Sequence, residues 1–415
     1  MHAKAARRLT IAVLSLLASL PALVAAQGAT ASDSLTRPVI SEHVAPLVRF
    51  EPIGSDGHRG EGFLRKPPGD GPFPAVVFIH GGLTRQTTGQ VSRYTLRANA
   101  SRFLEAGYVI AAITYRSRDL DPQSPDSLVD SLAAVEHVKK LAYVDADSVA
   151  VNGCSGGGDL VLDVAGKTEV AATVSEEPAT LLFTGMFSSN LPRAGASYSV
   201  ADALPMMLDP GGSFTEEAQR ITREKIGGIK SPVFIVQGDQ PLFPGGPDHL
   251  RVQDEILIPA LEAAGVDLSR KVYPGQEHCF AYSGSTEASL AAFEDIDAFL
   301  REHVPTKPVG IDAANVEHVP LNEPLRSAVT VPDEILQDYV GIYVLANGAG
   351  RIQITLDGGQ LAAEMVGQPR LLLYPESESV FYGHLEFEQL FEFARSDDGD
   401  VTHFIVNGGF RADRQ

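Results

Sequence analysis

Between Val48 and Pro305, short apolar, β-branched runs alternate with longer amphipathic stretches. Strands of a parallel sheet are buried on both faces and are joined by crossovers that are usually helices. The alternation therefore predicts an α/β fold, a doubly wound and mostly parallel sheet covered by helices on both faces. Strands are expected at 74–81, 108–115, 148–153, 170–175, 231–238 and 269–275, and helices at 95–107, 127–141, 159–166, 248–265 and 287–303.

The first residues indicate targeting rather than structure. In residues 1–26, Lys4, Arg7 and Arg8 precede an apolar run that ends in the small residues of "LVAA", which is typical of a signal peptide cleaved after Ala26. A membrane anchor is the alternative, but the apolar run is shorter than the roughly 20 residues that span a bilayer. We expect an exported protein, periplasmic or extracellular, with no membrane contact after processing.

The α/β domain is expected over residues 27–305. Its stretch 181–230 is long for a connection and contains Met206 and Met207, so it predicts a lid or pocket wall that packs against apolar surface. A surface insert is the alternative.

The remainder of the chain predicts a linker and a second domain. Residues 306–332 contain several prolines and no periodicity, as in a linker. Residues 333–415 begin with a short helical stretch and continue with alternating strands separated by turn signals, among them Asp357-Gly358 and Asp398-Gly399. A small antiparallel sheet or barrel, a β-rich domain, is expected there.

The net charge and the absence of certain motifs narrow the classes of partner and cofactor that this chain is expected to bind. The formal net charge is −20, which disfavours nucleic acid and anionic lipid as partners. The histidines do not fall into metal-ligand spacing, and the glycine cluster after Cys154 lacks the pattern of a phosphate or dinucleotide loop. The sequence therefore implies no metal and no other cofactor, and it does not reveal the oligomeric state.

The stretch "SVAVNGCSGGGDLVLDVAG" carries the chemistry. It predicts a buried strand, a turn of small residues and a helix, which puts Ser155 of the GxSxG pattern at the bend as a nucleophile. A serine hydroxyl needs a neighbouring imidazole to accept its proton and fixed donors for the charge that develops on the substrate oxygen.

The partners of Ser155 are sought at the ends of other strands. His278 in "KVYPGQEHCF" follows the last strand and is the expected base, and Asp239 in "VFIVQGDQP" follows the strand before it and is the expected acid. The order Ser, Asp, His suits this arrangement. The backbone N–H groups of Gly82, in "FIHGGL", and of Gly156 are the expected oxyanion hole.

With these motifs, "HGG", "GCSGGG", "QGDQP" and "YPGQEHCF", the region from about Val48 to Pro305 resembles the α/β-hydrolases, in particular the dienelactone hydrolase and prolyl oligopeptidase-like group. The C-terminal segments "LQDYVGIYV" and "ITLDGGQLAAEMVGQP" resemble a small β-rich domain appended to bacterial serine hydrolases of the β-lactamase-like class. The resemblance implies the fold and a serine hydrolase, and it implies no role for the C-terminal domain.

Two departures from that group keep alternatives open. Asp239 directly follows the strand's last glycine and Pro241 occupies the more usual position of the acid, so Asp248 is an alternative acid. Dienelactone hydrolases proper use a cysteine nucleophile, but Cys154 stands one position out of register for that role.

Other candidate residues flank the expected triad. Cys154 and Cys279 adjoin the nucleophile and the base, and a disulfide between them is one hypothesis. Further candidates could contact a substrate or could simply be surface or turn residues: the acidic pair Glu176 and Glu177 toward an amine, and Arg116 and Arg118 toward a carboxylate.

The predicted function is an exported serine hydrolase that cleaves small carboxylic esters through an acyl-enzyme. Its expected partner is a small-molecule ester, because too few residues precede the first strand for a substrate-filtering propeller. A peptidase or amidase with the same triad is the first alternative. A binding protein with a vestigial hydrolase domain is the second.

Overall fold

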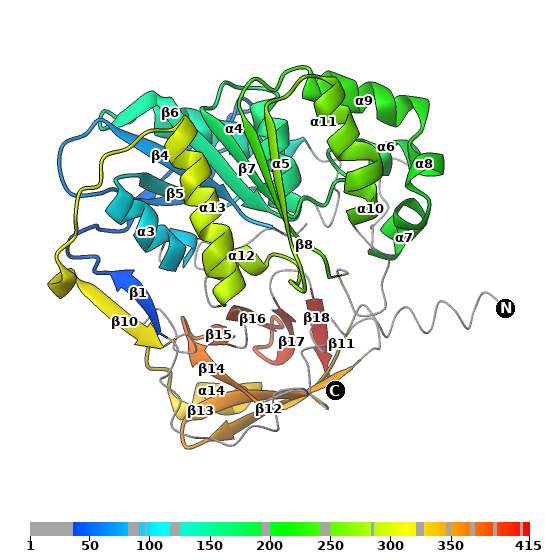
Figure 1. Cartoon of the computed structure of the whole chain (residues 1–415). Coiled ribbons are helices and arrows are strands. Elements are labelled where there is room, and N and C mark those ends of the chain that lie inside the picture. Colours follow the sequence, from blue (N-terminus) through cyan, green and yellow to red (C-terminus); the bar gives the residue numbers. More distant parts are fainter. Residues whose placement is uncertain are drawn as a thin grey trace. The chain divides into compact units, whose positions relative to one another are not determined.

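A computed structural model describes residues 36–81, 91, 93–95, 98–116, 125–191, 200–240, 250–283, 286–320, 328–345, 350–365, 370–384, 388–406 and 410–415. The expected signal peptide at 1–26 lies outside these residues. The chain divides into two compact units, with the division of the described residues between 319 and 320 (Figure 1). No helix among the described residues combines the length and apolar character needed to cross a bilayer.

The first unit is built on an eight-stranded sheet of order β2-β3-β5-β4-β6-β7-β8-β9. The pairs β2–β3 and β3–β5 are antiparallel, and the other pairs are parallel. The prediction of a doubly wound, mostly parallel sheet is thus confirmed. The strands are β2 (Val48–Phe50), β3 (Gly62–Arg65), β4 (Phe73–Ile79), β5 (Val109–Ile113), β6 (Val144–Cys154), β7 (Ala172–Glu176), β8 (Val233–Gly238) and β9 (Leu268–Tyr273).

Helices bury both faces of this sheet. Successive side chains of each strand point to opposite faces, so each strand contributes to the core on both sides. In β4, Val76 and Phe78 join the apolar cluster formed with α3 (Ala98–Ala106) and α13 (Glu287–His303). Ala75, Val77 and Ile79 join the cluster on the other face, which contains residues of α4 (Asp126–Lys139) and α5 (Gly156–Ala165). This two-sided burial is why the strands read as continuous apolar runs.

The helix α13 occupies the residues that the sequence predicted, 287–303. Its start is set by a capping box: the Thr286 side chain accepts from the N–H of Ser289, and the Ser289 side chain accepts from the N–H of Thr286. Reciprocal caps satisfy donors that the first turn of a helix leaves without partners. The last strand and the loop that carries His278 are therefore followed by a helix with a capped start.

The stretch 181–230 folds into short helices in its described part: α6 (Met186–Asn190), α7 (Val200–Leu208), α8 (Pro210–Ser213) and α9 (Glu216–Ile226). Met206 and Met207 are buried in an apolar cluster with Val252 and Ile256. The expected packing of the methionines is therefore present, and the role of this insert as a lid stays a prediction. Val252 and Ile256 belong to α10 (Leu250–Val252) and to the π-helix η2 (Gln253–Leu257), which continues into α11 (Ile258–Ala263).

The expected linker, 306–332, is partly structured. The 3-10 helix η3 (Ala313–Asn315) leads into β10 (Val316–Pro320), which pairs with β1 (Thr36–Ile40) in a two-stranded sheet. Val309 also donates its N–H to the Glu105 carbonyl at the end of α3. Residues 306–319 therefore belong to the first unit. No apolar period marks this segment because the paired strands are short.

The second unit is a closed antiparallel barrel of strands β11 to β18 in sequential order, preceded by α14 (Asp333–Tyr339). Its core is rich in aromatic side chains, including Tyr339, Tyr343, Phe381 and Phe404. Closure removes the exposed edges of a sheet. The strands are β11 (Gly341–Leu345), β12 (Arg351–Asp357), β13 (Gln360–Met365), β14 (Leu371–Pro375), β15 (Val380–His384), β16 (Glu388–Arg395), β17 (Val401–Val406) and β18 (Phe410–Arg414).

Candidate active site

Ser155 stands on the sharp turn between β6 and α5, with φ 58° and ψ −121°. The bend is so tight that a Cβ atom on Gly157 would lie 2.2 Å from the Ile79 carbonyl oxygen, and one on Gly153 would lie 2.5 Å from the Gly157 carbonyl oxygen. Only glycine fits at either position. Ser155 is partly exposed while its neighbours on both sides are buried.

Backbone donors adjoin this serine on two sides. Gly156 is the first residue of α5, where N–H groups have no partner within the helix and the helix dipole favours negative charge. Gly81 belongs to the loop after β4 and lies against the turn, because a Cβ atom on it would be 3.2 Å from the Ser155 Cβ. Gly82, the other predicted oxyanion donor, lies outside the described residues.

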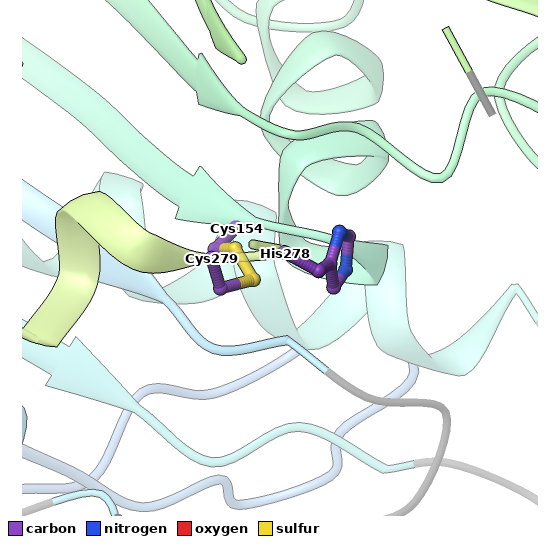
Figure 2. A group of neighbouring side chains, drawn as sticks. All are labelled: Cys154, His278 and Cys279. Atoms are coloured by element: carbon purple, nitrogen blue, oxygen red, sulfur yellow. A yellow bond between two sulfur atoms is a disulfide. The ribbon is translucent and has the colours of Figure 1, made fainter. Parts of the chain in front are cut away.

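A disulfide links the loop that carries His278 to the turn that carries Ser155. Cys154 at the end of β6 is bonded to Cys279, with a Cα–Cα distance of 6.1 Å, and Figure 2 shows the His278 side chain beside this bond. A ring nitrogen of His278 lies within 4.8 Å of both sulfur atoms. Each cysteine is the chain neighbour of a predicted triad residue, so the bond ties the Ser155 turn to the His278 loop. While it is intact, the sulfurs are not thiolate ligands for a metal ion.

The carboxylate at His278 is that of Glu177. Its Oε2 lies 3.0 Å from His278 Nδ1, and its Oε1 accepts the N–H of Gly238 at 3.2 Å. The Glu177 side chain is 1% exposed, whereas that of His278 is 20% exposed. A buried carboxylate at Nδ1 holds the proton on that nitrogen and leaves Nε2 to act as the base.

Asp239, the predicted acid, forms hydrogen bonds with groups other than His278. Its Oδ1 accepts the N–H of Gly275 at 2.7 Å and the Gln240 side-chain amide at 2.9 Å, and these hydrogen bonds lower the pKa of its carboxyl group. The structure thus places Glu177, and not Asp239, beside the imidazole. Glu177 follows β7, the direct neighbour in the sheet of the strand β6 that leads into the Ser155 turn, whereas Asp239 follows β8. The alternative acid, Asp248, lies outside the described residues.

Backbone strain concentrates at this site. Among the described residues, the non-glycine residues with positive φ are Ser155, Glu177, Thr180 and Cys279. Such conformations cost free energy and persist where the surrounding structure enforces them. Glu177 is held by its N–H, which donates to the Val236 carbonyl, and the next turn is held by the buried Asp159.

Asp159, in the first turn of α5, supports the segment after Glu177. Its carboxylate accepts the N–H groups of Thr180, Leu182 and Phe183 at 2.7 to 3.1 Å. Burial raises the pKa of Asp159 to about 7, and these backbone donors partly offset that effect. The helix that follows Ser155 therefore also fixes the turn that follows Glu177.

The remaining candidates have other roles. Glu176 is buried and its carbonyl oxygen accepts the N–H of Ser155 at 2.9 Å, so this residue supports the turn. Arg116 is bound by Asp130 and Asp56, each at 2.8 Å, which occupies the guanidinium proposed for a substrate carboxylate. Arg118 lies outside the described residues.

His80 supports the loop that carries Gly81. It is fully buried, its ring stacks on Tyr115 with centroids 4.0 Å apart, and the Tyr115 hydroxyl donates to the His80 carbonyl oxygen. Burial lowers the pKa of His80 to about 4. The imidazole is therefore neutral in the folded protein at neutral pH.

This burial predicts a pH-dependent stability. Between pH 6.5 and 4 the unfolded chain binds a proton at His80 that the folded protein does not, so the stability is present above pH 6.5 and is lost as the pH falls toward 4. The full effect is about 3 kcal/mol. We expect His80→Asn to flatten the fall in the free energy of urea unfolding between pH 7 and pH 4.5. His43→Asn, at an exposed histidine, is the control. An equally steep fall in His80→Asn would contradict the assignment.

The first unit has the sheet order and the site arrangement that are typical of the α/β-hydrolase fold: a serine on the strand-to-helix turn, a histidine after the last strand, and a buried carboxylate at its Nδ1.

Two family models match separate parts of the chain. The family model BD-FAE matches residues 64–184, and the model described as "Domain of unknown function (DUF3471)" matches residues 325–414. The quorum-quenching protein AidA of Acinetobacter baumannii (strain MDR-ZJ06) is 30% identical over 156 residues, 35% of this chain and 47% of that protein. The human acyl-coenzyme A thioesterase 6 is 31% identical over 126 residues, 30% of this chain and 27% of that protein. The chain thus spans about half and about a quarter of these two relatives.

Solved structures resemble this chain at lower sequence identity. The esterase Est22 has a TM-score of 0.44 at 18% identity and covers 63% of this chain and 84% of its own. A putative dienelactone hydrolase from Klebsiella pneumoniae subsp. pneumoniae MGH 78578 has a TM-score of 0.42 at 18% identity and covers 62% and 99%. A puromycin hydrolase has a TM-score of 0.47 at 17% identity and covers 70% and 43%.

Proposed function

We propose that this protein hydrolyses small carboxylic esters through an acyl-enzyme formed on Ser155. The observation that carries the proposal is the hydrogen-bonded pair of His278 Nδ1 and the buried Glu177 carboxylate, tied by the Cys154–Cys279 disulfide to the turn that bears Ser155. A histidine held in this way is suited to accept the proton of the serine hydroxyl.

The proposed mechanism has two halves. The Ser155 oxygen attacks the ester carbonyl carbon, His278 takes the hydroxyl proton, and the oxyanion is bound by backbone N–H groups, that of Gly156 among them. His278 then donates the proton to the leaving alcohol as the carbon–oxygen bond breaks. In the second half, His278 removes a proton from water, the hydroxide attacks the acyl carbon, and Ser155 leaves with the proton from His278. Glu177 stabilises the imidazolium in both halves.

The experiment that tests this proposal combines labelling with a substrate panel. A fluorophosphonate should attach to the wild-type protein at Ser155, and p-nitrophenyl esters of short acids should be cleaved. Ser155→Ala should neither be labelled nor cleave these esters. Ester cleavage at the wild-type rate by Ser155→Ala would refute the proposal. A parallel panel of aminoacyl anilides distinguishes an esterase from a peptidase, and labelling without turnover of either panel would point to a binding protein.

We also propose that the protein is exported. The pattern of residues 1–26 supports this, and so does the disulfide, because such bonds form and persist in oxidising compartments. Protein purified from the periplasm or culture medium should begin at Gln27. Full-length protein confined to the cytoplasm would contradict export.

A further inference from the structure

A chain of buried amide side chains leads away from Glu177. Gln237, the residue before Gly238 at the end of strand β8, is fully buried, and its Nε2 lies 3.5 Å from Glu177 Oε2. Its Oε1 accepts from Gln253 Nε2 at 2.5 Å. Gln253 is itself fully buried, so the chain runs through the interior from the acid of the site to the π-helix η2.

Gln253 holds the acid by a second route. Its Nε2 also donates to the carbonyl oxygen of Pro178 at 3.3 Å, and Pro178 directly follows Glu177. Glu177 has φ 46°, a conformation that the surroundings must enforce. One side chain therefore contacts both the residue that touches the carboxylate and the backbone of the strained turn.

Burial of the polar Gln253 side chain costs free energy, and packing alone does not explain why a polar residue stands there. Gln253 Oε1 is buried and has no hydrogen-bond partner among the described residues. A buried polar atom without a partner costs free energy, and an apolar side chain of the same size would avoid that cost. Gln253 also begins a π-helical turn, a local distortion of helices that is frequent at functional sites.

We propose that Gln253 is a positioning residue, which acts through Gln237 and Pro178 to hold Glu177 in line with His278 Nδ1. Gln253 does not touch the reacting atoms. It fixes the rotamer of Gln237 and the turn at Pro178, and these two contacts fix the carboxylate. The inference rests on the function proposed above.

The test compares Gln253→Met with Gln389→Met. Methionine matches the length of glutamine without its hydrogen bonds, and Gln389 is a buried glutamine of the barrel, which belongs to the other unit. For Gln253→Met we expect kcat for a p-nitrophenyl ester to fall roughly tenfold or more with KM unchanged, because a small displacement of a catalytic group is costly. Gln389→Met should retain the wild-type kcat.

A spectroscopic readout separates positioning from a general loss of structure. The proton between His278 Nδ1 and Glu177 should give a downfield proton resonance, identified by its absence in His278→Ala, and this resonance should shift or broaden in Gln253→Met. The double variant Gln237→Met with Gln253→Met should lose less than the product of the two single losses, since both act on Glu177.

The outcomes are distinguishable. If Ser155→Ala is inactive but Gln253→Met keeps the wild-type kcat and resonance, the positioning role is wrong and the proposed function stands. Equal losses in Gln253→Met and Gln389→Met would also overturn the positioning role. If Ser155→Ala remains active, the proposed function itself fails.

Discussion

Glu177→Gln is expected to lower kcat for an ester by about 10³- to 10⁴-fold, whereas Asp239→Asn should leave it near the wild-type value. Glutamine keeps the shape of the side chain but carries no charge to stabilise the imidazolium of His278. Its amide can also present a donor to Nδ1 and so favour the wrong tautomer. Asp239, in contrast, binds the Gly275 N–H and the Gln240 amide at the partly exposed edge of the site.

The measurement is steady-state kinetics on one p-nitrophenyl ester, with both variants checked for the wild-type midpoint of urea unfolding. The matched pair matters because both changes replace a carboxylate by its amide, one at His278 and one away from it. A large loss in Asp239→Asn together with normal activity in Glu177→Gln would return the acid's role to Asp239.

The second large effect concerns the disulfide. The bond closes a loop with a sequence separation of 125 residues between Cys154 and Cys279. The chain-entropy model gives about 5 kcal/mol of stability for a loop of this length, because the bond restricts the unfolded chain. We expect the double variant Cys154→Ser with Cys279→Ser to lose up to about this amount in the free energy of urea unfolding.

Activity should fall in the same variant under conditions where it remains folded. The bond joins the chain neighbours of Ser155 and His278, so its removal frees the two loops to separate, and we expect kcat to fall at least roughly tenfold. Dithiothreitol should inhibit the wild-type protein and leave the double variant unaffected. Two free thiols in the mass of the unreduced wild-type protein, or full stability and activity of the double variant, would contradict this role.

Much of the fold follows from local patterns. The six predicted strands of the central sheet correspond to β4 to β9, and the predicted span of α13 agrees with the structure. Buried strands and amphipathic helices have periodicities that are legible in a single sequence. The strands β2 and β3 are short and lie at the edge of the sheet, so they carry too few apolar residues to give that signal.

The candidate site also has residues that local sequence marks and a residue that only the tertiary structure reveals. The glycines at 153 and 157 around Ser155 and the loop position of His278 are local features, so the sequence alone predicts both residues as candidates. The sequence marks Glu177 only as half of an acidic pair that could contact a substrate amine. The available signal was its place immediately after the strand next to the nucleophile strand, but strand order is a property of the sheet and not of the sequence.

The sequence by itself determined the class of fold, the bend that exposes Ser155, and the histidine after the last strand, because each depends on residues close together in the chain. Only the tertiary structure decided which carboxylate faces His278 and that Cys154 bonds to Cys279. Those choices depend on how strands far apart in sequence meet at one edge of the sheet. The 3.0 Å hydrogen bond between His278 Nδ1 and Glu177 Oε2 depends on that placement of the strands, and no periodicity along the chain encodes it.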